Sequence, residues 1–499
     1  MPAVEVTIDG IEPPASTLGR SGWVIVGTLV LATVLANIAS VCLFPQIVTL
    51  SQEFGRPVNQ VVWTMAGFHV IAAGVGGVAA ALGAIVGNRR MLAITLVLLL
   101  IGSLVAALSN SLSLLIAARV LQGVSMAIQA LSIGIIANSW RGEPMRRAMS
   151  MIVFAMGSGA VIAYLLSGII WKSGGTWRTL FWLLAGATVL DLVLTVGFIK
   201  ETKRRKDVRI DYAGCAGLVG WTVLLLLPLS QANSWGWGSA KLLGLLLPGA
   251  LVLVLWVVWE LRTREPLVDL RLLSRPGVWQ GGIVWLALAI GLLIPAVTLP
   301  YLFQTPVASG FGFGRSMFVV ALALGTPGIV MCFLSPVAAP IMRRLGPRRT
   351  MLLGALFGLN AFGMAFAHGS LWLTFLWMAL NGVPAALAGS GSYALAAEAV
   401  APEQGILVST IYNIAAGTGC TIASAVAGYV LTLRQVAVPV STPGGVQNQP
   451  FPANATITWA ALIAAGMAVA GVIAVFSIRT GRLRADRARD PQPLLMPSD

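Results

Sequence analysis

Long runs of apolar residues, separated by short polar breaks, cover almost the whole chain. Each run is long enough to cross a bilayer, for which a helix needs about 20 mostly apolar residues. The runs are continuous rather than alternating, which excludes a membrane β-barrel built from strands of about ten residues. The pattern predicts an all-α polytopic membrane protein with fourteen transmembrane helices, over residues 23–48, 59–86, 91–109, 112–138, 148–171, 177–199, 211–230, 241–260, 278–303, 315–342, 349–367, 371–397, 405–433 and 456–478.

Composition supports the same class of protein. Hydrophobic residues make up 57% of the 499 residues and charged residues only 10%, against about 45–50% and 25% in soluble domains. A chain this apolar has too little polar surface to cover a water-soluble globule. The four cysteines all lie in apolar runs, so they are expected to remain small packed thiols. The first run is too long for a cleaved signal peptide.

The positions of lysine and arginine predict the orientation. If the N-terminus is cytoplasmic, 25 of the 32 basic residues fall on the cytoplasmic side, six fall on the other side, and Arg119 lies within a span. Cytoplasmic loops carry such an excess in membrane proteins. We therefore expect a multi-pass membrane protein with both termini cytoplasmic. Arginine greatly outnumbers lysine and Ala and Gly are abundant, which favours the inner (plasma) membrane of a bacterium. The net charge of +15 is then explained by attraction to anionic membrane lipids, with no need for nucleic acid.

The polar segments offer no place for soluble catalytic chemistry. They lack a GxxxxGK[ST] phosphate loop, an HExxH zinc motif and a GxSxG nucleophile motif. The longest segment on the outer side, about 434–455, is rich in Pro, Gly and Gln and is expected to be a loop. A polytopic membrane enzyme or sensor would need clustered His, Asp or Glu at one interface, and the chain has only two histidines. No enzyme activity, cofactor or metal is expected.

Several motifs together carry a resemblance. The fourth span reads LLIAARVLQG, in which Arg119, Gln122 and Gly123 fit the pattern Rxx[QG]G. GAIVGNRRML after the second span has a counterpart in APIMRRLGPRRTML after the tenth, where an internal repeat would place it. With WRTLF and EQGILVSTIYNIAAGTG, these motifs make residues from about 22 to 478 resemble the major facilitator superfamily, in particular its fourteen-span drug:proton antiporter branch.

The resemblance implies a fold and a function. It implies two six-helix bundles that rock around a site near the middle of the membrane, in a transporter that exports amphiphilic small molecules or drugs, and we expect a monomer. An alternative is a transporter of the same fold that moves lipid or metabolite cargo without proton coupling; a membrane enzyme or sensor is a remote third. The implied domains are a cytoplasmic tail (1–22), an N-terminal bundle (23–199), an inserted helix pair with basic loops (200–276), a C-terminal bundle (277–478) and a second cytoplasmic tail (479–499).

The chain departs from the resembled family at positions that carry proton coupling there. Ala36 stands where the family has an aspartate in the first span, next to Asn37. Ala84 replaces the aspartate of the loop motif after the second span. Ala163 and Tyr164 replace the Gly-Pro pair of the antiporter motif in the fifth span. The usual assignment of proton coupling therefore does not carry over.

Three embedded residues are candidates for coupling. Arg119 is the most costly, at roughly 2.5–3.5 kcal/mol for a charge at a helix centre. It is expected either to face the cavity and couple cargo or proton to the rocking motion, or to bind backbone carbonyls of a neighbouring helix. His69 titrates near neutrality in water, but a lone histidine also commonly hydrogen-bonds to an adjacent helix. Asp191 lies in a supporting span of the resembled fold, so a structural hydrogen bond is favoured.

Other residues are candidates for the cavity and for gating. His368 lies at the end of a span and is expected to be exposed. Arg89, Arg90, Arg348 and Arg349 are expected either to fix the orientation or to pair across the bundle interface as gates. The cavity is expected to be lined by polar and aromatic side chains from inner helices, namely Asn37, His69, Arg119, Gln122, Gln129, Trp285, Tyr301, Asn381, Tyr393, Tyr412 and Asn413.

Overall fold

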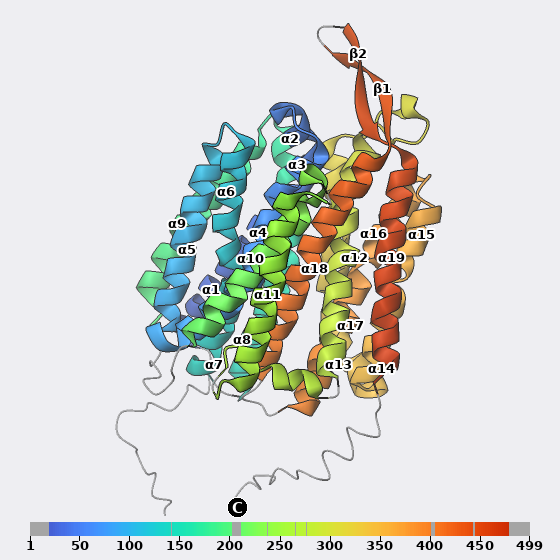
Figure 1. The fold of residues 1–499 in the computed structure, drawn as a ribbon. Helices are drawn as coiled ribbons and strands as arrows, with labels where there is room; N and C mark the ends of the chain where they lie inside the picture. The colour runs from blue at the N-terminus through green and yellow to red at the C-terminus, as the bar shows by residue number, and fades with distance from the viewer. Residues whose placement is uncertain are drawn as a thin grey trace, which may run out of the picture.

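The computed structural model is built from long helices that lie side by side (Figure 1). It describes residues 19–140, 142–201, 211–236, 238–264, 266–275, 277–400, 405–442 and 445–478. Within these residues, fourteen helical segments are long and apolar enough to cross a membrane. The prediction of an all-α polytopic protein with fourteen spans is confirmed.

The spans form two bundles with a helix pair between them in sequence. The N-terminal bundle contains α1 (Arg20–Val41), α2 (Ile47–Phe54), α3 (Val58–Val61), α4 (Trp63–Val86), α5 (Asn88–Ala107), α6 (Leu112–Gly123), α7 (Ala127–Ser139), α8 (Gly142–Lys172) and α9 (Trp177–Phe198). The inserted pair is α10 (Tyr212–Trp235) and α11 (Ala240–Arg262). The C-terminal bundle contains α12 (Val278–Gln304), α13 (Met317–Leu345), α14 (Pro347–Phe357), α15 (Asn360–Phe366), α16 (Leu371–Leu380), α17 (Gly382–Ala399), α18 (Gly405–Leu433) and α19 (Asn454–Phe476).

Several spans are interrupted rather than continuous. The first span breaks between α1 and α2 at the turn η1 (Phe44–Gln46), which contains Pro45. The fourth span breaks between α6 and α7 at the turn η2 (Val124–Met126). A break leaves backbone carbonyls without their usual partners four residues on, and such groups need other donors inside a membrane. The first break therefore creates acceptors in the middle of the N-terminal bundle.

The largest contacts between the two bundles are made by two helix pairs. One contact joins α8 to α13, and the other joins α4 to α18. In the inserted pair, α10 packs on α11, on α4 and on α18, so it covers the second contact from outside. The outer face of α11 exposes Leu247, Leu251 and Val254, as expected for a helix that faces lipid. Figure 1 shows α10 and α11 in green in front of this contact.

The segment after α18, expected to be a loop, folds as a hairpin. Strands β1 (Gln435–Thr442) and β2 (Gly445–Pro452) pair antiparallel and project from one end of the helices (Figure 1). The start of the segment, QVAVPV, has valine at every second position, the period of a strand, and Val438 and Phe451 are buried. We call this end of the molecule, which also carries α2, the hairpin end, and the opposite end the termini end.

Candidate functional site

The bundles are packed tightly from the middle of the molecule to the hairpin end. A Cβ atom added at Gly168 of α8 would lie 2.9 Å from Cβ of Ala321 on α13. One added at Gly417 of α18 would lie 2.8 Å from the Cα atom of Ala73 on α4. Glycine is required at both positions because the neighbouring helix comes too close for any side chain. These contacts close the hairpin end between the bundles.

A cavity of about 220 Å³ lies between the bundles. Its wall is formed on one side by α1, α4 and α8, and on the other by α12, α13, α16, α17 and α18. A site shared by two bundles is the position where a rocking motion changes access. We take this central cavity as the candidate functional site.

The wall of the central cavity is apolar. Among the described residues that line it, none is Asp, Glu, Lys or Arg. The side chains with polar or sulfur atoms are Ser40, His69, Tyr164, Cys420, Met156, Met331 and Met378. A ligand in this cavity would meet mostly aliphatic, thioether and aromatic groups with very few hydrogen-bonding points.

His69 is the one histidine in the wall. Its Nδ1 lies 2.9 Å from the carbonyl oxygen of Met65, one turn earlier on α4, and therefore carries the proton that is donated there. In that tautomer Nε2 accepts from the hydroxyl of Ser40 at 3.3 Å. The ring of Phe68 packs edge-on against it, with 5.3 Å between centroids. His69 thus connects α4 to the broken end of α1, directly at the cavity.

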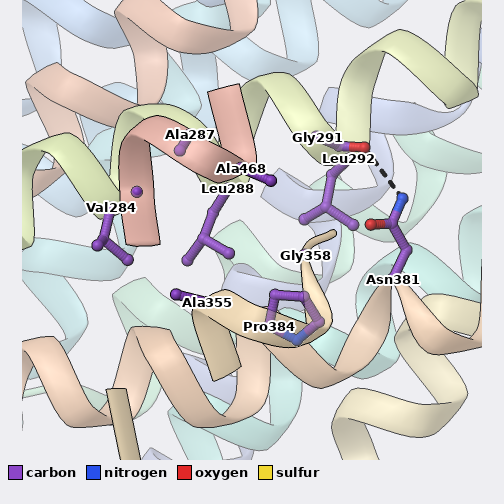
Figure 2. Close-up of a pocket in the computed structure, with 11 residues that line it drawn as sticks. Val284, Ala287, Leu288, Gly291, Leu292, Ala355, Gly358, Asn381, Pro384 and Ala468 are labelled. Carbon is purple, nitrogen blue, oxygen red and sulfur yellow. Dashed lines mark hydrogen bonds between the residues drawn. The ribbon is translucent and has the colours of Figure 1, made fainter. Parts of the chain in front are cut away.

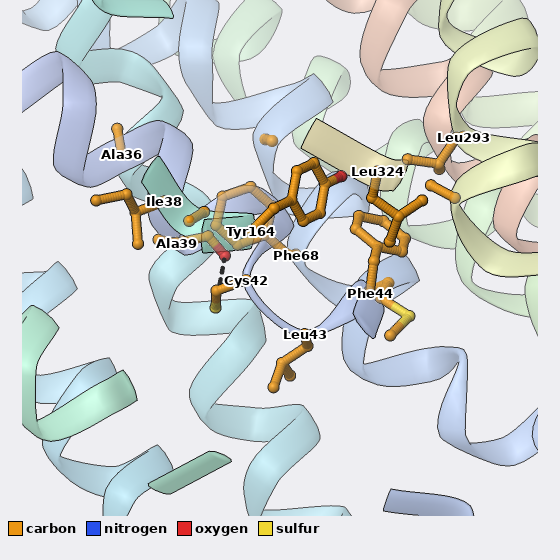
Figure 3. Close-up of a cluster of buried hydrophobic side chains, with 14 of the residues drawn as sticks. Ala36, Ile38, Ala39, Cys42, Leu43, Phe44, Phe68, Tyr164, Leu293 and Leu324 are labelled. Atoms are coloured by element: carbon orange, nitrogen blue, oxygen red, sulfur yellow. Dashed lines mark hydrogen bonds between the residues drawn. The ribbon is translucent and has the colours of Figure 1, made fainter. Parts of the chain in front are cut away.

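Tyr164 is a wall residue that the sequence did not single out as a site. It lies on α8 and is 7% exposed, and its hydroxyl forms no hydrogen bond within the described part of the chain. Figure 3 shows its ring between the bundles, with the hydroxyl on the side of Leu324 and Leu293 from the opposite bundle. The available signal was its position, since it replaces the proline of the antiporter motif.

Arg119 is fully buried and does not line the cavity. Its Nη1 donates to the carbonyl of Ala39 and to the side chain of Gln122, both at 2.6 Å. Its Nε donates to the carbonyl of Thr64 at 2.9 Å, and Nη2 lies 3.4 Å from the carbonyl of Ser40. Because Ala39 and Ser40 belong to the last turn of α1, the guanidinium caps the carbonyls that the break leaves unpaired. Of the two roles expected for Arg119, this geometry matches the second, in which the side chain binds backbone carbonyls of neighbouring helices.

Other candidates from the N-terminal bundle lie behind the wall. Gln122 is fully buried and donates to Ser103 at 2.9 Å. Asn37 donates to the carbonyl of Thr33 within α1 at 2.8 Å. Gln129 is within 2.9 Å of the sulfur of Met156, which itself lines the cavity. These residues support the wall, and the expectation that they line it is not met.

Three aromatic candidates form a separate cluster in the C-terminal bundle. Tyr393 of α17 packs against Trp285 of α12 and Tyr412 of α18, with centroids 5.5 Å and 5.2 Å apart. Trp285 donates to the hydroxyl of Ser392 at 2.9 Å. The Tyr412 hydroxyl lies 3.5 Å from the carbonyl of Gly277, just before α12 begins. The cluster therefore lies toward the termini end and does not line the central cavity.

Asn381 lines a second, smaller cavity of about 30 Å³ within the C-terminal bundle (Figure 2). Its amide donates to the carbonyl of Gly291 at 3.0 Å, and the rest of the wall is apolar. This volume is about that of one water molecule, so the cavity is too small for cargo. Tyr301 is buried near the hairpin end of α12, and Asn413 is exposed on α18.

Two expectations about ionisable residues are wrong. Asp191 makes no structural hydrogen bond: it is fully buried, and neither carboxyl oxygen has a partner among the described residues. It lies on α9, which packs against α5 and α1 and not at the cavity. His368 is buried rather than exposed, because its ring folds back to the carbonyl of Met364 at 2.8 Å and lies 2.6 Å from the side chain of Asn454 at the start of α19.

Three of the four loop arginines contact groups in their own half of the chain. Arg89 donates to the carbonyl of Val196, and Arg90 lies 3.4 Å from the carboxylate of Glu201. Arg348 donates to the carbonyl of Phe476 at 3.3 Å. Arg349 is exposed. Within the described residues, these contacts fix helix ends and none of them crosses between the bundles.

Similar proteins agree with this architecture. Methyl viologen resistance protein SmvA of Salmonella typhimurium is 27% identical over 437 residues, covering 86% of each chain. Multidrug resistance protein B homolog of Mycobacterium tuberculosis is 26% identical over 425 residues, covering 82% of this chain and 76% of that protein. Among solved structures, a peptide transporter POT in complex with alafosfalin matches with a TM-score of 0.64 at 15% identity, over 92% of this chain and 95% of that one.

A family comparison gives the assignment. The human organic anion transporter TETRAN has the same fold, with a TM-score of 0.60 at 16% identity over 92% of this chain. The model of the Major Facilitator Superfamily matches residues 29–359 and 282–495. Relatives and structural neighbours alike are small-molecule transporters and not enzymes. The chain is therefore a multi-pass membrane transporter that belongs to the Major Facilitator Superfamily.

Proposed function

We propose that this transporter exports amphiphilic small molecules or drugs by alternating access through the central cavity. The observation that carries the proposal is an apolar cavity between the two bundles. At the hairpin end, closely packed helices hold the bundles together. A cavity of this character suits molecules with a large apolar surface and few polar groups. The names of the relatives, which refer to methyl viologen and multidrug resistance, support an efflux role.

The proposal includes an orientation. We infer that the protein acts as a monomer in the bacterial inner membrane, with both termini in the cytoplasm and the hairpin outside. The excess of basic residues on the side of the termini supports this, since it matches the cytoplasmic bias of membrane proteins and favours anionic lipids. In this orientation the closed hairpin end faces outward.

Cysteine labelling tests the orientation. Single cysteines at Arg205, which lies outside the described residues, and at Gly445 of the hairpin are placed in a variant without native cysteines. In intact cells, an impermeant maleimide is expected to label position 445 and to label position 205 only after permeabilisation. Cysteines at Arg344 and Arg434 serve as matched controls for the two sides. Labelling of 205 and 445 from the same side would exclude the fourteen-span orientation.

Energy coupling has one candidate at the cavity. The family's acidic positions are Ala36 and Ala84 in this chain, and no carboxylate lines the cavity among the described residues. Arg119 does not release its proton at physiological pH and is bound to carbonyls, while Asp191 lies away from the cavity on α9. We infer that coupling either runs through His69 or is absent, with transport driven by the gradient of the cargo.

Flux measurements with an imposed pH gradient test the function and the coupling together. Purified protein in liposomes is assayed with two probes, the uncharged phenylnaphthylamine and the cation ethidium; movement of either supports export. If the pH gradient accelerates flux in wild type, His69→Ala is expected to lower the gradient-driven flux by about tenfold or more, as for an essential proton carrier. Asp191→Asn is expected to keep the acceleration. His368→Ala is the matched histidine control. Gradient-driven flux that persists in His69→Ala and is lost in Asp191→Asn would identify Asp191 as the coupling residue instead.

The alternative is a transporter of the same fold that carries lipid or metabolite cargo without a proton cycle. The uncharged wall of the cavity supports this alternative, because the described lining residues include no carboxylate that could exchange a proton against cargo. The same experiment separates the two. Flux of the probes that is unaffected by any pH gradient, in wild type and in all three variants, supports the uncoupled transporter.

A further inference from the structure

The Tyr164 hydroxyl is the least satisfied polar group in the central cavity. Tyr164 is only 7% exposed and lines the cavity, and within the described residues its hydroxyl has no hydrogen-bond partner. A hydroxyl that faces an apolar cavity gains a hydrogen bond when a bound molecule brings an acceptor to it. The other polar groups of the wall are engaged, since His69 and Ser40 bind each other and His69 also binds Met65. Tyr164 therefore offers one free donor to whatever occupies the cavity.

The charges near the cavity disfavour a charged occupant. The wall contains no carboxylate among its described residues, so a cation entering it would lose its hydration without gaining a counter-ion. The charged group next to the wall is Arg119, which packs on Phe68 at 4.7 Å and lies within reach of the Ser40 carbonyl. Its positive charge would repel a cation. An anion would gain little, because the guanidinium donors already bind Ala39, Thr64 and Gln122.

The size and surface of the cavity suit an aromatic group. Its volume is about 220 Å³, whereas a dry apolar cavity of about 150 Å³ already accepts benzene. The thioethers of Met156, Met331 and Met378 are polarizable and pack well against ring edges. An uncharged aromatic molecule can thus fill the space and keep the apolar wall covered.

From these observations we propose that the cargo is an uncharged, lipophilic and ring-containing molecule with an acceptor atom to which the Tyr164 hydroxyl donates a hydrogen bond. This inference rests on the proposed function, because it assumes that the central cavity holds the cargo. It makes Tyr164 the residue that selects for an acceptor, and it makes the uncharged wall and Arg119 the elements that reject cations. The selectivity for uncharged cargo is set by this wall and not by the fold.

Three probes of one skeleton test the inference. Bipyridine is uncharged at mildly alkaline pH and has ring nitrogens that accept hydrogen bonds; biphenyl lacks the acceptors; methyl viologen is the dication of the same rings. Equilibrium binding of each is measured to purified wild type, to Tyr164→Phe and to the control Tyr212→Phe, whose side chain is 72% exposed at the start of α10. Phenylalanine keeps the ring of Tyr164, so packing is preserved.

We expect wild type and Tyr212→Phe to bind bipyridine saturably and more tightly than biphenyl, and to bind methyl viologen at least tenfold more weakly. In Tyr164→Phe, the affinity for bipyridine is expected to fall by about three- to tenfold, the loss typical of one hydrogen bond, while that for biphenyl stays unchanged. Methyl viologen binding as tightly as bipyridine, equal bipyridine affinity in Tyr164→Phe, or no saturable binding of bipyridine would each overturn the inference. Transport of ethidium in the liposome assay would overturn it as well while leaving export intact; binding without any flux would instead contradict the proposed function.

Discussion

Replacing Arg119 with alanine is expected to destabilise the folded protein rather than only to stop transport. The substitution removes the donors to Ala39, Thr64 and Gln122 in the centre of the N-terminal bundle. Hydrogen bonds to a charged group contribute about 1.5–3 kcal/mol each, and buried acceptors left unpaired cost a similar amount. We therefore expect a loss of about 4 kcal/mol or more in the free energy of unfolding.

Thermal unfolding and size-exclusion chromatography in detergent measure this loss. Arg119→Ala is expected to unfold at a much lower temperature than wild type and to yield little monodisperse protein. Arg56→Ala is the matched control, because Arg56 is exposed before α3 and its removal should leave the unfolding temperature unchanged. An Arg119→Ala protein that unfolds like wild type and yet transports nothing would contradict the structural role and restore the coupling role for this arginine.

The fourteen spans and the family were predictable from the sequence because they depend on the length and order of apolar runs. A bilayer requires about 20 apolar residues for each helix, and the chain marks the breaks with charged residues, proline, glycine or asparagine. The motif around Arg119 was equally visible. Its two interpretations were not separable, since the acceptors on α1 exist only because that helix breaks before Pro45.

The membership of the cavity wall was not predictable for a physical reason. In a soluble helix the buried face is the apolar one, whereas here the face toward lipid and the face toward protein are both apolar. Asn37 and Tyr164 lie on spans of similar composition, but only Tyr164 reaches the cavity. Polarity alone therefore placed Gln122 and Asn381 in the wall, although each hydrogen-bonds inside its own bundle.

The two ionisable residues with wrong predictions show the same limit. His368 follows the end of α15 and is buried through contacts to Met364 and to Asn454, a residue far along the chain. Whether Asp191 finds a hydrogen-bond donor depends on which side chains of α1 and α5 lie opposite it. Among the described residues, no side chain donates to its carboxylate. Such contacts are set by the packing of helices and not by local sequence.

Locking the hairpin end closed is expected to abolish transport. Asn59 precedes α4 and Gly428 lies on α18, so the pair joins the two bundles at this end. A Cβ atom at Gly428 would lie 3.5 Å from the Cα atom of Asn59, within the range that a disulfide spans. Cysteines at both positions, in a background with Cys42, Cys215, Cys332 and Cys420 replaced by alanine, are therefore expected to cross-link in the state seen here.

The control pair joins helices that move together. A Cβ atom at Gly220 of α10 would lie 3.5 Å from a side-chain methyl of Val252 on α11, so cysteines at these positions link the inserted helices to each other and not the two bundles. We expect this cross-link to form under the same oxidant and to leave the flux of cargo unchanged. It thereby controls for oxidation and for the loss of the native cysteines.

The most direct test of alternating access is the flux of phenylnaphthylamine through liposomes containing the Asn59→Cys, Gly428→Cys protein before oxidation, after oxidation and after reduction. Alternating access predicts full flux in the reduced protein, a fall of about tenfold or more to background in the oxidised protein, since cargo can no longer leave at the hairpin end, and recovery with a thiol reductant. Flux that continues at the reduced rate while the two cysteines are cross-linked would contradict the account, because cargo would then cross the membrane without opening between the bundles.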